Sequence, residues 1–397
     1  MRARFFSTGT VIPAILLAAL GSDVVLRSMP LEPFAFRPWE AAIRYHAPDA
    51  PFVANQSFRK TRAYGDLAAL GDFPQDRQYR SETFTTDSWG YRNPPSASEA
   101  PPSGLLMGSS FAVGTGVNDE ETLSAQLGRE LRTTIYNAGG QTPELWRIRE
   151  LERRLDIHRG VVLYEFLERS DAPVIPEGEG APPPKPPLEQ VFDRWGLERT
   201  YLFLDGWTAV SPLEVAIGRR YRALKDNRLL PKDLSGVIER PLRNGEPMLF
   251  LRFEAESLYQ HRLRAEFIEY WRWLRKQLDA DGLDLVVVLV PSKYTVYGDL
   301  LAQPDNRLQE GVSFLSRLET GLEDRGIVAV NLTGPLRKAA AEGVDERRYV
   351  FWRDDTHWNA AGIAVAAHEV ARVLRSSNLP VASPSNGEAP QGPKAQE

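Results

Sequence analysis

The sequence predicts an α/β fold of three layers, in which helices cover both faces of a central parallel sheet. Apolar strand-like runs alternate along the chain with segments of helical spacing, as parallel βαβ units require. One run, residues 283–290, consists almost entirely of Leu and Val, which is typical of a central strand buried on both faces. Around this sheet we expect an irregular N-terminal lead-in and a mostly helical insertion.

Composition limits the classes of protein. A chain of 397 residues, 42% of them hydrophobic, can bury a full core. The net charge is -5, and basic residues are spread among acidic ones, so we expect no nucleic-acid partner. The chain has no cysteine, which excludes disulfides, thiolate metal sites and a cysteine nucleophile.

Residues 1–28 have the layout of a secretory signal. Arg2 and Arg4 precede an apolar run at residues 11–20, and the small residues Ala19 and Gly21 permit cleavage before Ser22. Asp23 shortens any continuous apolar span below the roughly 20 residues that a membrane crossing requires. The sequence therefore predicts export, with this segment as either a cleaved signal peptide or a membrane anchor.

The rest of the chain divides by composition. Residues 29–103 are rich in Pro, Arg and aromatic side chains and predict the lead-in, with a strand-like run at 82–86. A run rich in Pro and Ser, residues 94–103, marks its end. We expect the main domain over 104–375, with an insertion at about 172–256, and a disordered tail over 376–397.

The main domain alternates strands and helices. Strands are expected at 105–107, 133–136, 161–166, 283–290 and 327–331, and helices at 121–131, 143–155, 258–278, 308–322 and 360–374. The weak mixed pattern over 199–244 predicts helices and loops. Phe267, Tyr270 and Trp271 form an aromatic stripe that we expect to face the core rather than bind sugar.

The strand at 105–107 ends in a turn that contains the candidate nucleophile. The turn is Gly108-Ser109-Ser110-Phe111. A glycine permits a tight backbone at a strand end, and such a turn can hold one hydroxyl at the carboxyl edge of the sheet. Ser110 is that hydroxyl. An ordinary loop rich in Ser and Gly has the same composition, so the turn alone leaves both interpretations open.

Residues 353–359 supply the expected base and acid. A serine hydroxyl is a weak nucleophile until a base takes its proton and a carboxylate orients that base. Among five histidines, His357 alone follows two carboxylates and a strand-like run. Asp355 is the expected acid, and Asp354 is the alternative. A metal site on these three residues is the weaker interpretation, because no second His or Glu cluster completes it.

Four blocks carry a resemblance to a known family. The stretch GSSFAVGTGV resembles the nucleophile block of SGNH hydrolases, and DTHWN at 355–359 resembles their terminal acid and histidine block. The more similar family is the alginate O-acetyltransferases of bacterial exopolysaccharides, which carry GTSF-like, DTHW, PxKxxxY and WExxER-like motifs. In this chain they correspond to residues 108–111, 355–358, 291–297 and 164–169.

Two departures from these families affect the expected site. In the alginate enzymes the DTHW block precedes the serine block, whereas here the serine comes first, so the order looks circularly permuted. No GxND block follows the strand at 161–166, and Glu165 with Arg169 occupy its place. We expect Glu165 to orient either Arg169 or Lys293. These two cations either orient groups at the site or form structural ion pairs.

The groups that would donate hydrogen bonds to the oxyanion are less defined than the serine, histidine and aspartate. The candidates are the backbone N–H groups of Ser110 and of the turn at Gly139 and Gly140, and Arg353 is a weaker candidate. No metal or other cofactor is expected.

The resemblance implies an SGNH-like fold and acyl transfer through an ester on Ser110, with Asp355 orienting His357. It implies an acetyl group and a cell-envelope or secreted polysaccharide as acceptor, in the periplasm or another extracytoplasmic compartment. Because acetyl-CoA is not expected there, it also implies a membrane O-acyltransferase that delivers the acetyl group. An esterase using the same residues and a non-catalytic polysaccharide-binding or assembly protein are the alternatives.

Overall fold

A five-stranded parallel sheet forms the centre of the protein, in the order β4-β3-β5-β8-β9. The computed structural model describes residues 8–27, 37–43, 50–176, 187–197, 236–257, 261–305 and 314–377, and the single residues 200, 201, 204, 213, 217, 307 and 379. The strands are β3 (Gly104–Met107), β4 (Ile135–Asn137), β5 (Gly160–Leu167), β8 (Leu283–Val290) and β9 (Val328–Asn331). The two long strands, β5 and β8, pair along their full length in the middle of the sheet.

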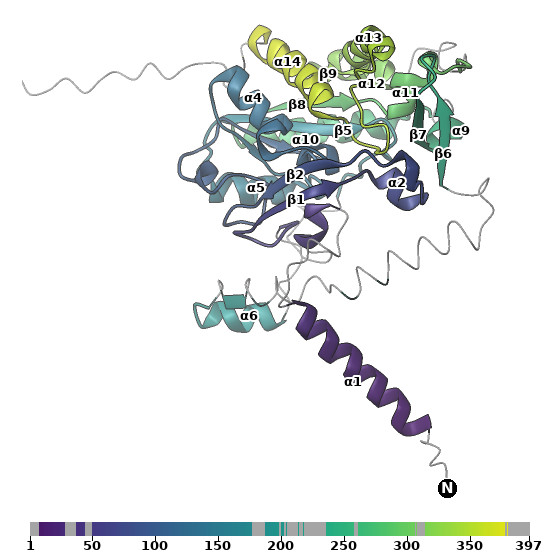
Figure 1. Cartoon of the computed structure of the whole chain (residues 1–397). Helices are drawn as coiled ribbons and strands as arrows, with labels where there is room; N and C mark the ends of the chain where they lie inside the picture. Colours follow the sequence, from purple (N-terminus) through teal and green to yellow (C-terminus); the bar gives the residue numbers. More distant parts are fainter. Residues whose placement is uncertain are drawn as a thin grey trace, which may run out of the picture.

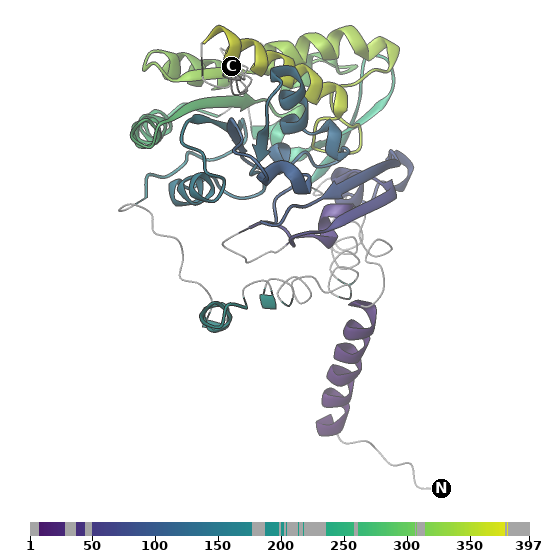
Figure 2. The same cartoon turned by 90° about the vertical axis from the view of Figure 1, so that its left-hand side faces the viewer.

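Helices cover both faces of this sheet (Figures 1 and 2). One layer contains α4 (Leu123–Leu131), α13 (Thr333–Gly343) and α14 (Ala360–Ser376), and the other contains α5 (Leu145–Arg154), α10 (Ala265–Ala280) and α12 (Phe314–Glu323). Because strand side chains alternate between faces, Leu106 packs with the first layer, and Leu105 and Met107 pack with the second. The predicted three-layer α/β/α fold is confirmed.

One predicted helix begins later than its apolar pattern suggested. The pattern over 258–278 predicted a single helix, but α10 starts at Ala265, because Arg264 has extended backbone angles (φ -106, ψ 157). The aromatic stripe lies in the core as expected: Phe267, Tyr270 and Trp271 are all buried. Trp271 meets Tyr164 of β5 edge to face, with ring centroids 4.5 Å apart.

The described part of the insertion adds a pair of strands to the helices that the sequence predicts. Besides α6 (Pro187–Arg194) and α9 (Arg252–Ser257), it contains an antiparallel hairpin of β6 (Val237–Pro241) and β7 (Pro247–Leu251). Long-range contacts fix β7, because the Leu249 N–H donates to the carbonyl oxygen of Arg353 (2.9 Å) and its side chain is buried. The proline-rich run at 177–186 and the predicted tail from residue 380 onward lie outside the described residues.

The lead-in forms a second small sheet against the main domain. Strand β1 (Ser57–Ala63) pairs antiparallel with β2 (Arg80–Thr85), and α2 (Asp66–Leu70) lies between them in sequence. The strand-like run predicted at 82–86 overlaps the end of β2, which stops at Thr85. A Cβ placed on Gly65 would lie 1.9 Å from the carbonyl oxygen of Asp354, so the lead-in backbone packs directly on the loop before α14.

The first helix, α1 (Thr8–Arg27), covers most of the predicted signal or anchor segment. It stands apart from the sheet and its helices (Figure 2), and side chains such as Ile12, Leu16 and Leu17 are exposed. None of the helices in the described ranges combines the length and hydropathy that a membrane crossing demands.

Candidate active site

The serine turn sits at the carboxyl end of β3. Gly108 has φ +149, and a Cβ there would lie 2.4 Å from a carboxylate oxygen of Glu165, so only glycine fits. The Ser109 hydroxyl caps the one-turn helix α3 (Ser110–Val113) by accepting from the Phe111 N–H (3.1 Å). Ser110 therefore opens this helix, with its hydroxyl at the edge of the sheet.

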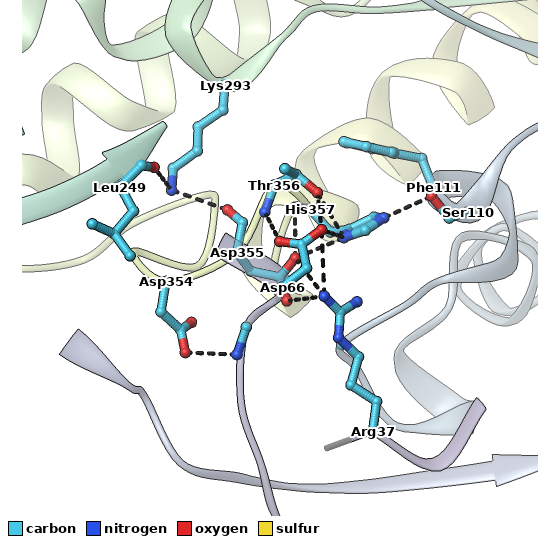
Figure 3. Close-up of polar contacts among 12 residues, drawn as sticks. Arg37, Asp66, Ser110, Phe111, Leu249, Lys293, Asp354, Asp355, Thr356 and His357 are labelled. Carbon is cyan, nitrogen blue, oxygen red and sulfur yellow. Dashed lines mark hydrogen bonds and ion pairs between the residues drawn. The ribbon is translucent and has the colours of Figure 1, made fainter. Parts of the chain in front are cut away.

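Three side chains form a hydrogen-bonded line across 247 positions of sequence (Figure 3). The distance from Ser110 Oγ to His357 Nε2 is 2.7 Å, and the distance from His357 Nδ1 to Asp355 Oδ1 is also 2.7 Å. The imidazole is 5% exposed and packs on the Phe111 ring, with centroids 4.7 Å apart. The structure thus brings together the three residues that the sequence singled out.

Two arginines of the lead-in bind the carboxylate of Asp355. Arg80 Nη2 lies 2.7 Å and Arg37 Nη2 lies 3.3 Å from Asp355 Oδ2. Burial raises the pKa of Asp355, but the charges of Arg37, His357 and Arg80 outweigh burial and hold that pKa well below its usual range. Asp355 is therefore ionised at neutral pH and can hold the proton on His357 Nδ1.

Asp354 has a different set of partners from the one expected of an alternative acid. Its Oδ2 accepts the N–H groups of Gly65 (2.7 Å) and Gln78 (2.8 Å), and its Oδ1 accepts from Arg80 (3.1 Å). Among the contacts of the described residues, none joins Asp354 to His357. Asp354 fixes the lead-in to the loop rather than orienting the imidazole.

A carboxylate of the lead-in, Asp66, lies close to the histidine. It accepts the N–H (2.8 Å) and the hydroxyl (2.6 Å) of Thr356, and its Oδ2 lies 3.7 Å from His357 Nδ1. Asp66, Asp355 and His357 are close enough to share a metal ion. However, Arg37 Nη2 already lies 3.4 Å from Asp66 and 3.3 Å from Asp355. A guanidinium thus balances both carboxylates, and this donor set does not fit a metal site.

Glu165 supports the serine turn, so the expectation that it orients Arg169 or Lys293 is wrong. Its Oε2 accepts the N–H (2.7 Å) and the hydroxyl (2.8 Å) of Ser109. Arg169 pairs instead with Glu254 (2.7 Å). Burial raises the pKa of Glu165 to about 7, because a charged carboxylate loses its hydration there.

This raised pKa predicts how stability changes with pH. The folded pKa of Glu165 is about 7 and the reference value is 4.5, so between these values the folded protein keeps a proton that the unfolded chain has lost. Raising the pH through this window therefore destabilises the fold, by about 2–3 kcal/mol for this group. Glu165→Gln should weaken the fall in unfolding free energy between pH 5 and pH 8, measured by urea denaturation. A variant that retains the full wild-type fall would contradict the assignment.

Lys293 and Arg353 have structural partners. The Lys293 ammonium donates to the carbonyl oxygens of Leu249 (2.6 Å), Arg353 (3.0 Å) and Asp355 (3.0 Å). Burial lowers the pKa of Lys293 to about 7, opposed by the nearby aspartates. The Arg353 guanidinium binds Glu246 of the hairpin (2.8 Å). Both side chains hold the hairpin and the loop together, and neither contacts Ser110 in the described part of the chain.

The expected oxyanion donors at the glycine turn are already engaged. The Gly139 N–H donates to Asn137 Oδ1 (3.0 Å), and the Gly140 N–H donates to the Gly108 carbonyl oxygen (2.9 Å). The Ser110 N–H belongs to the first turn of α3, where N–H groups have no partner within the helix. Of the donors that the sequence suggested, Gly139, Gly140 and Arg353 have partners within the protein, which leaves the Ser110 N–H as the candidate oxyanion donor.

Sequence reasoning missed three residues of the lead-in: Arg37, Asp66 and Arg80. They lie 318, 290 and 275 positions from their respective partners in the DDTH loop. No local pattern marks them, because each is a common residue type in a stretch without periodicity. Their role becomes visible only when the lead-in is folded against the loop.

Comparison with known proteins gives a match in the second half of the chain. Residues 249–394 match the family described as "SGNH hydrolase-like domain, acetyltransferase AlgX". This range includes Lys293 and His357, and Ser110 lies before it. A solved structure of a G-D-S-L family protein from Desulfitobacterium hafniense DCB-2 is 12% identical and covers 68% of this chain and 99% of that chain, with a TM-score of 0.31. At that TM-score the overlap carries no argument.

Curated relatives are described as "Probable alginate O-acetylase AlgJ". The relative from Pseudomonas fluorescens is 31% identical over 119 residues, 29% of this chain and 27% of the relative. The relative from Azotobacter vinelandii is 31% identical over 104 residues, 26% and 25% of the two chains. The chain thus spans less than a third of the length of these relatives. Through these matches and its α/β/α fold, the chain resembles the SGNH hydrolase superfamily and, within it, the AlgX and AlgJ type.

Proposed function

We propose that this protein is an O-acetyltransferase that acetylates an exported or cell-envelope polysaccharide through an ester on Ser110. The observation that carries the proposal is the line of two 2.7 Å hydrogen bonds from Ser110 through His357 to Asp355. The similarity to an acetyltransferase family and to proteins described as alginate O-acetylases supports acetyl as the group and a polysaccharide as the acceptor.

The first half of the reaction forms the acetyl ester. His357 Nε2 takes the proton of Ser110 Oγ while this oxygen attacks the carbonyl carbon of the acetyl donor. The Ser110 N–H faces the negative oxygen that develops. The imidazolium then gives its proton to the leaving group, and the bond between the donor and the acetyl carbon breaks. Asp355 stays ionised throughout and holds Nδ1–H.

The second half transfers the acetyl group. A hydroxyl of the acceptor sugar gives its proton to His357 Nε2 and attacks the acetyl carbon. The bond to Ser110 Oγ breaks, and this oxygen recovers a proton from the imidazolium. If water takes the place of the sugar hydroxyl, the product is free acetate and the protein is an esterase.

The location and the donor belong to the same proposal. The apolar side chains that α1 exposes support an export signal or an anchor at the N-terminus. We place the protein outside the cytoplasm, where a membrane O-acyltransferase would deliver the acetyl group. Such a partner would supply the chemistry that acetyl-CoA supplies inside the cell.

A product analysis tests the proposal. The full chain is incubated with a chromogenic acetyl ester, with and without an acceptor oligosaccharide, and both acetylated sugar and free acetate are measured. The transferase predicts acetylated sugar at the expense of acetate. Free acetate alone in both mixtures would identify an esterase, and no release of chromophore in either would favour a binding or assembly protein.

A further inference from the structure

Two arginines and two tyrosines of the lead-in form a cluster at the surface, in which Arg62 and Tyr79 are exposed and Tyr64 and Arg77 are half-buried. The Arg62 guanidinium lies over the Tyr79 ring (4.2 Å to the centroid), and the Arg77 guanidinium lies over the Tyr64 ring (4.5 Å). The two rings meet edge to face at 5.8 Å. Tyr79 is 49% exposed. We call these four residues the Arg–Tyr cluster.

The cluster borders the loop that carries the acid and the histidine. Tyr64 directly precedes Gly65, and Tyr79 directly follows Gln78. The N–H groups of Gly65 and Gln78 both donate to Asp354 Oδ2, the neighbour of Asp355. In Figure 1 the segments that carry the cluster, next to β1, α2 and β2, lie along one flank of the central sheet.

The cluster carries positive charge that the protein leaves largely unbalanced. Among the described residues, no carboxylate lies within 4 Å of Arg62, and the acid paired with Arg77 is Asp72, at 3.8 Å. By contrast, Arg80 nearby is balanced by Asp354 and Asp355. The whole chain has a net charge of -5, so this positively charged patch is opposite in sign to the protein as a whole.

The chemistry of the patch selects a planar anion next to an apolar ring. A guanidinium that lies flat on a ring is held in place, and its N–H edge can bind a carboxylate through two hydrogen bonds. The exposed part of the Tyr79 ring can pack against the C–H face of a sugar, because the ring is apolar. A carboxylate-bearing sugar offers both features.

We propose that the Arg–Tyr cluster is a subsite that binds carboxylate-bearing sugar units of the acceptor polysaccharide, beside the loop of Asp355 and His357. The identification of the bound polymer as acceptor rests on the proposed function. The binding itself does not, because it is measured without turnover.

Calorimetric titration of the full chain with an oligomer of uronic acid tests the subsite, with a neutral oligosaccharide of equal length as comparison. The wild-type protein should bind the uronate oligomer, and more weakly at high salt. Arg62→Gln with Arg77→Gln should weaken this binding by about tenfold or more. Arg59→Gln is the matched control, since Arg59 is exposed on the same strand outside the cluster, and should change binding less than about twofold.

Other outcomes would overturn the subsite. One is equal binding of the neutral and the uronate oligomer by the wild type. Another is unchanged binding of the uronate oligomer by the double variant. A third is a double variant that loses binding to phosphatidylglycerol vesicles but keeps its binding to the uronate oligomer. The rate of hydrolysis of a small acetyl ester should be the same in the double variant as in the wild type, because the cluster does not touch Ser110 or His357. A fall in this rate as large as the fall in oligomer binding would show that the arginines act through the loop and not by binding the polymer. A wild-type protein that binds the oligomer but turns over no ester would refute the proposed function alone.

Discussion

Replacing Ser110 by alanine is expected to lower the rate of acetyl release from a chromogenic ester on the order of 10⁵- to 10⁶-fold. Ser110 Oγ is the oxygen that lies 2.7 Å from His357 Nε2, so without it no acetyl ester can form on the protein. The substitution removes one atom and one hydrogen bond, so the fold should persist. The measurements are kcat/KM for the ester and the mass of the protein after quenching, which should show an added acetyl group only in the wild type.

The neighbouring hydroxyl supplies the matched control. Ser109 caps α3 and donates to Glu165 but has no contact with His357 in the described structure. Ser109→Ala should therefore cost about 1 kcal/mol of stability through the lost cap and retain most of the ester turnover. A Ser109→Ala variant that is inactive beside an active Ser110→Ala variant would transfer the nucleophile to position 109.

The sheet and the serine–histidine line were accessible from sequence because their signals are local. The apolar run at 283–290 marks its own burial, and it is β8 residue for residue. Gly108 marks the turn at the carboxyl end of β3, the edge where ligands bind in such sheets. The DTHW block marks a second loop by its acid and histidine; that loop lies between α13 and α14 rather than at the end of a sheet strand, so its place beside Ser110 depends on packing as well as on the sheet.

The surroundings of the acid were not accessible, because they depend on side chains that meet only after folding. Arg37 and Arg80 become ligands of Asp355 through the docking of the lead-in, which no periodicity predicts. The choice between Asp354 and Asp355 was open for the same reason. Both lie within three positions of His357 in sequence, and the lead-in amides that bind Asp354 decide between them.

The hairpin β6–β7 was missed for a related reason. The weak mixed pattern over 199–244 includes β6, and the partner strand β7 is held by contacts of Leu249 with Lys293 and Arg353. Tertiary contacts of this kind override a weak local preference. The same contacts explain why Arg353, a weaker oxyanion candidate in the sequence, holds the loop instead, and why Lys293 has the structural role that the sequence left open.

Asparagine at position 355 should reduce kcat by about 10⁴-fold, whereas asparagine at position 354 should leave most of the activity. The Asp355 carboxylate accepts a hydrogen bond from the Nδ1–H group of His357, at 2.7 Å. An amide there can donate to Nδ1 and stabilise the tautomer whose Nε2 carries the proton and cannot accept one from Ser110. Asp354 makes no such contact. Its replacement should loosen the lead-in, because the Asp354 carboxylate accepts the N–H groups of Gly65 and Gln78, without changing the tautomer.

Stability must be separated from chemistry in this pair, because Asp355 also balances Arg37 and Arg80. Removing its charge leaves two buried guanidiniums with less compensation, at a cost of about 3–5 kcal/mol. The rates are therefore normalised to the folded fraction, measured by circular dichroism under assay conditions.

The sign of the pH effect on stability gives an independent check. The folded pKa of Asp355 lies below its reference value of 3.8, so its stabilisation is present above that pH and is lost as the pH falls further. Asp355→Asn should remove this acid-side fall. Equal normalised rates for the two asparagine variants would show that the acid at 355 does not orient His357.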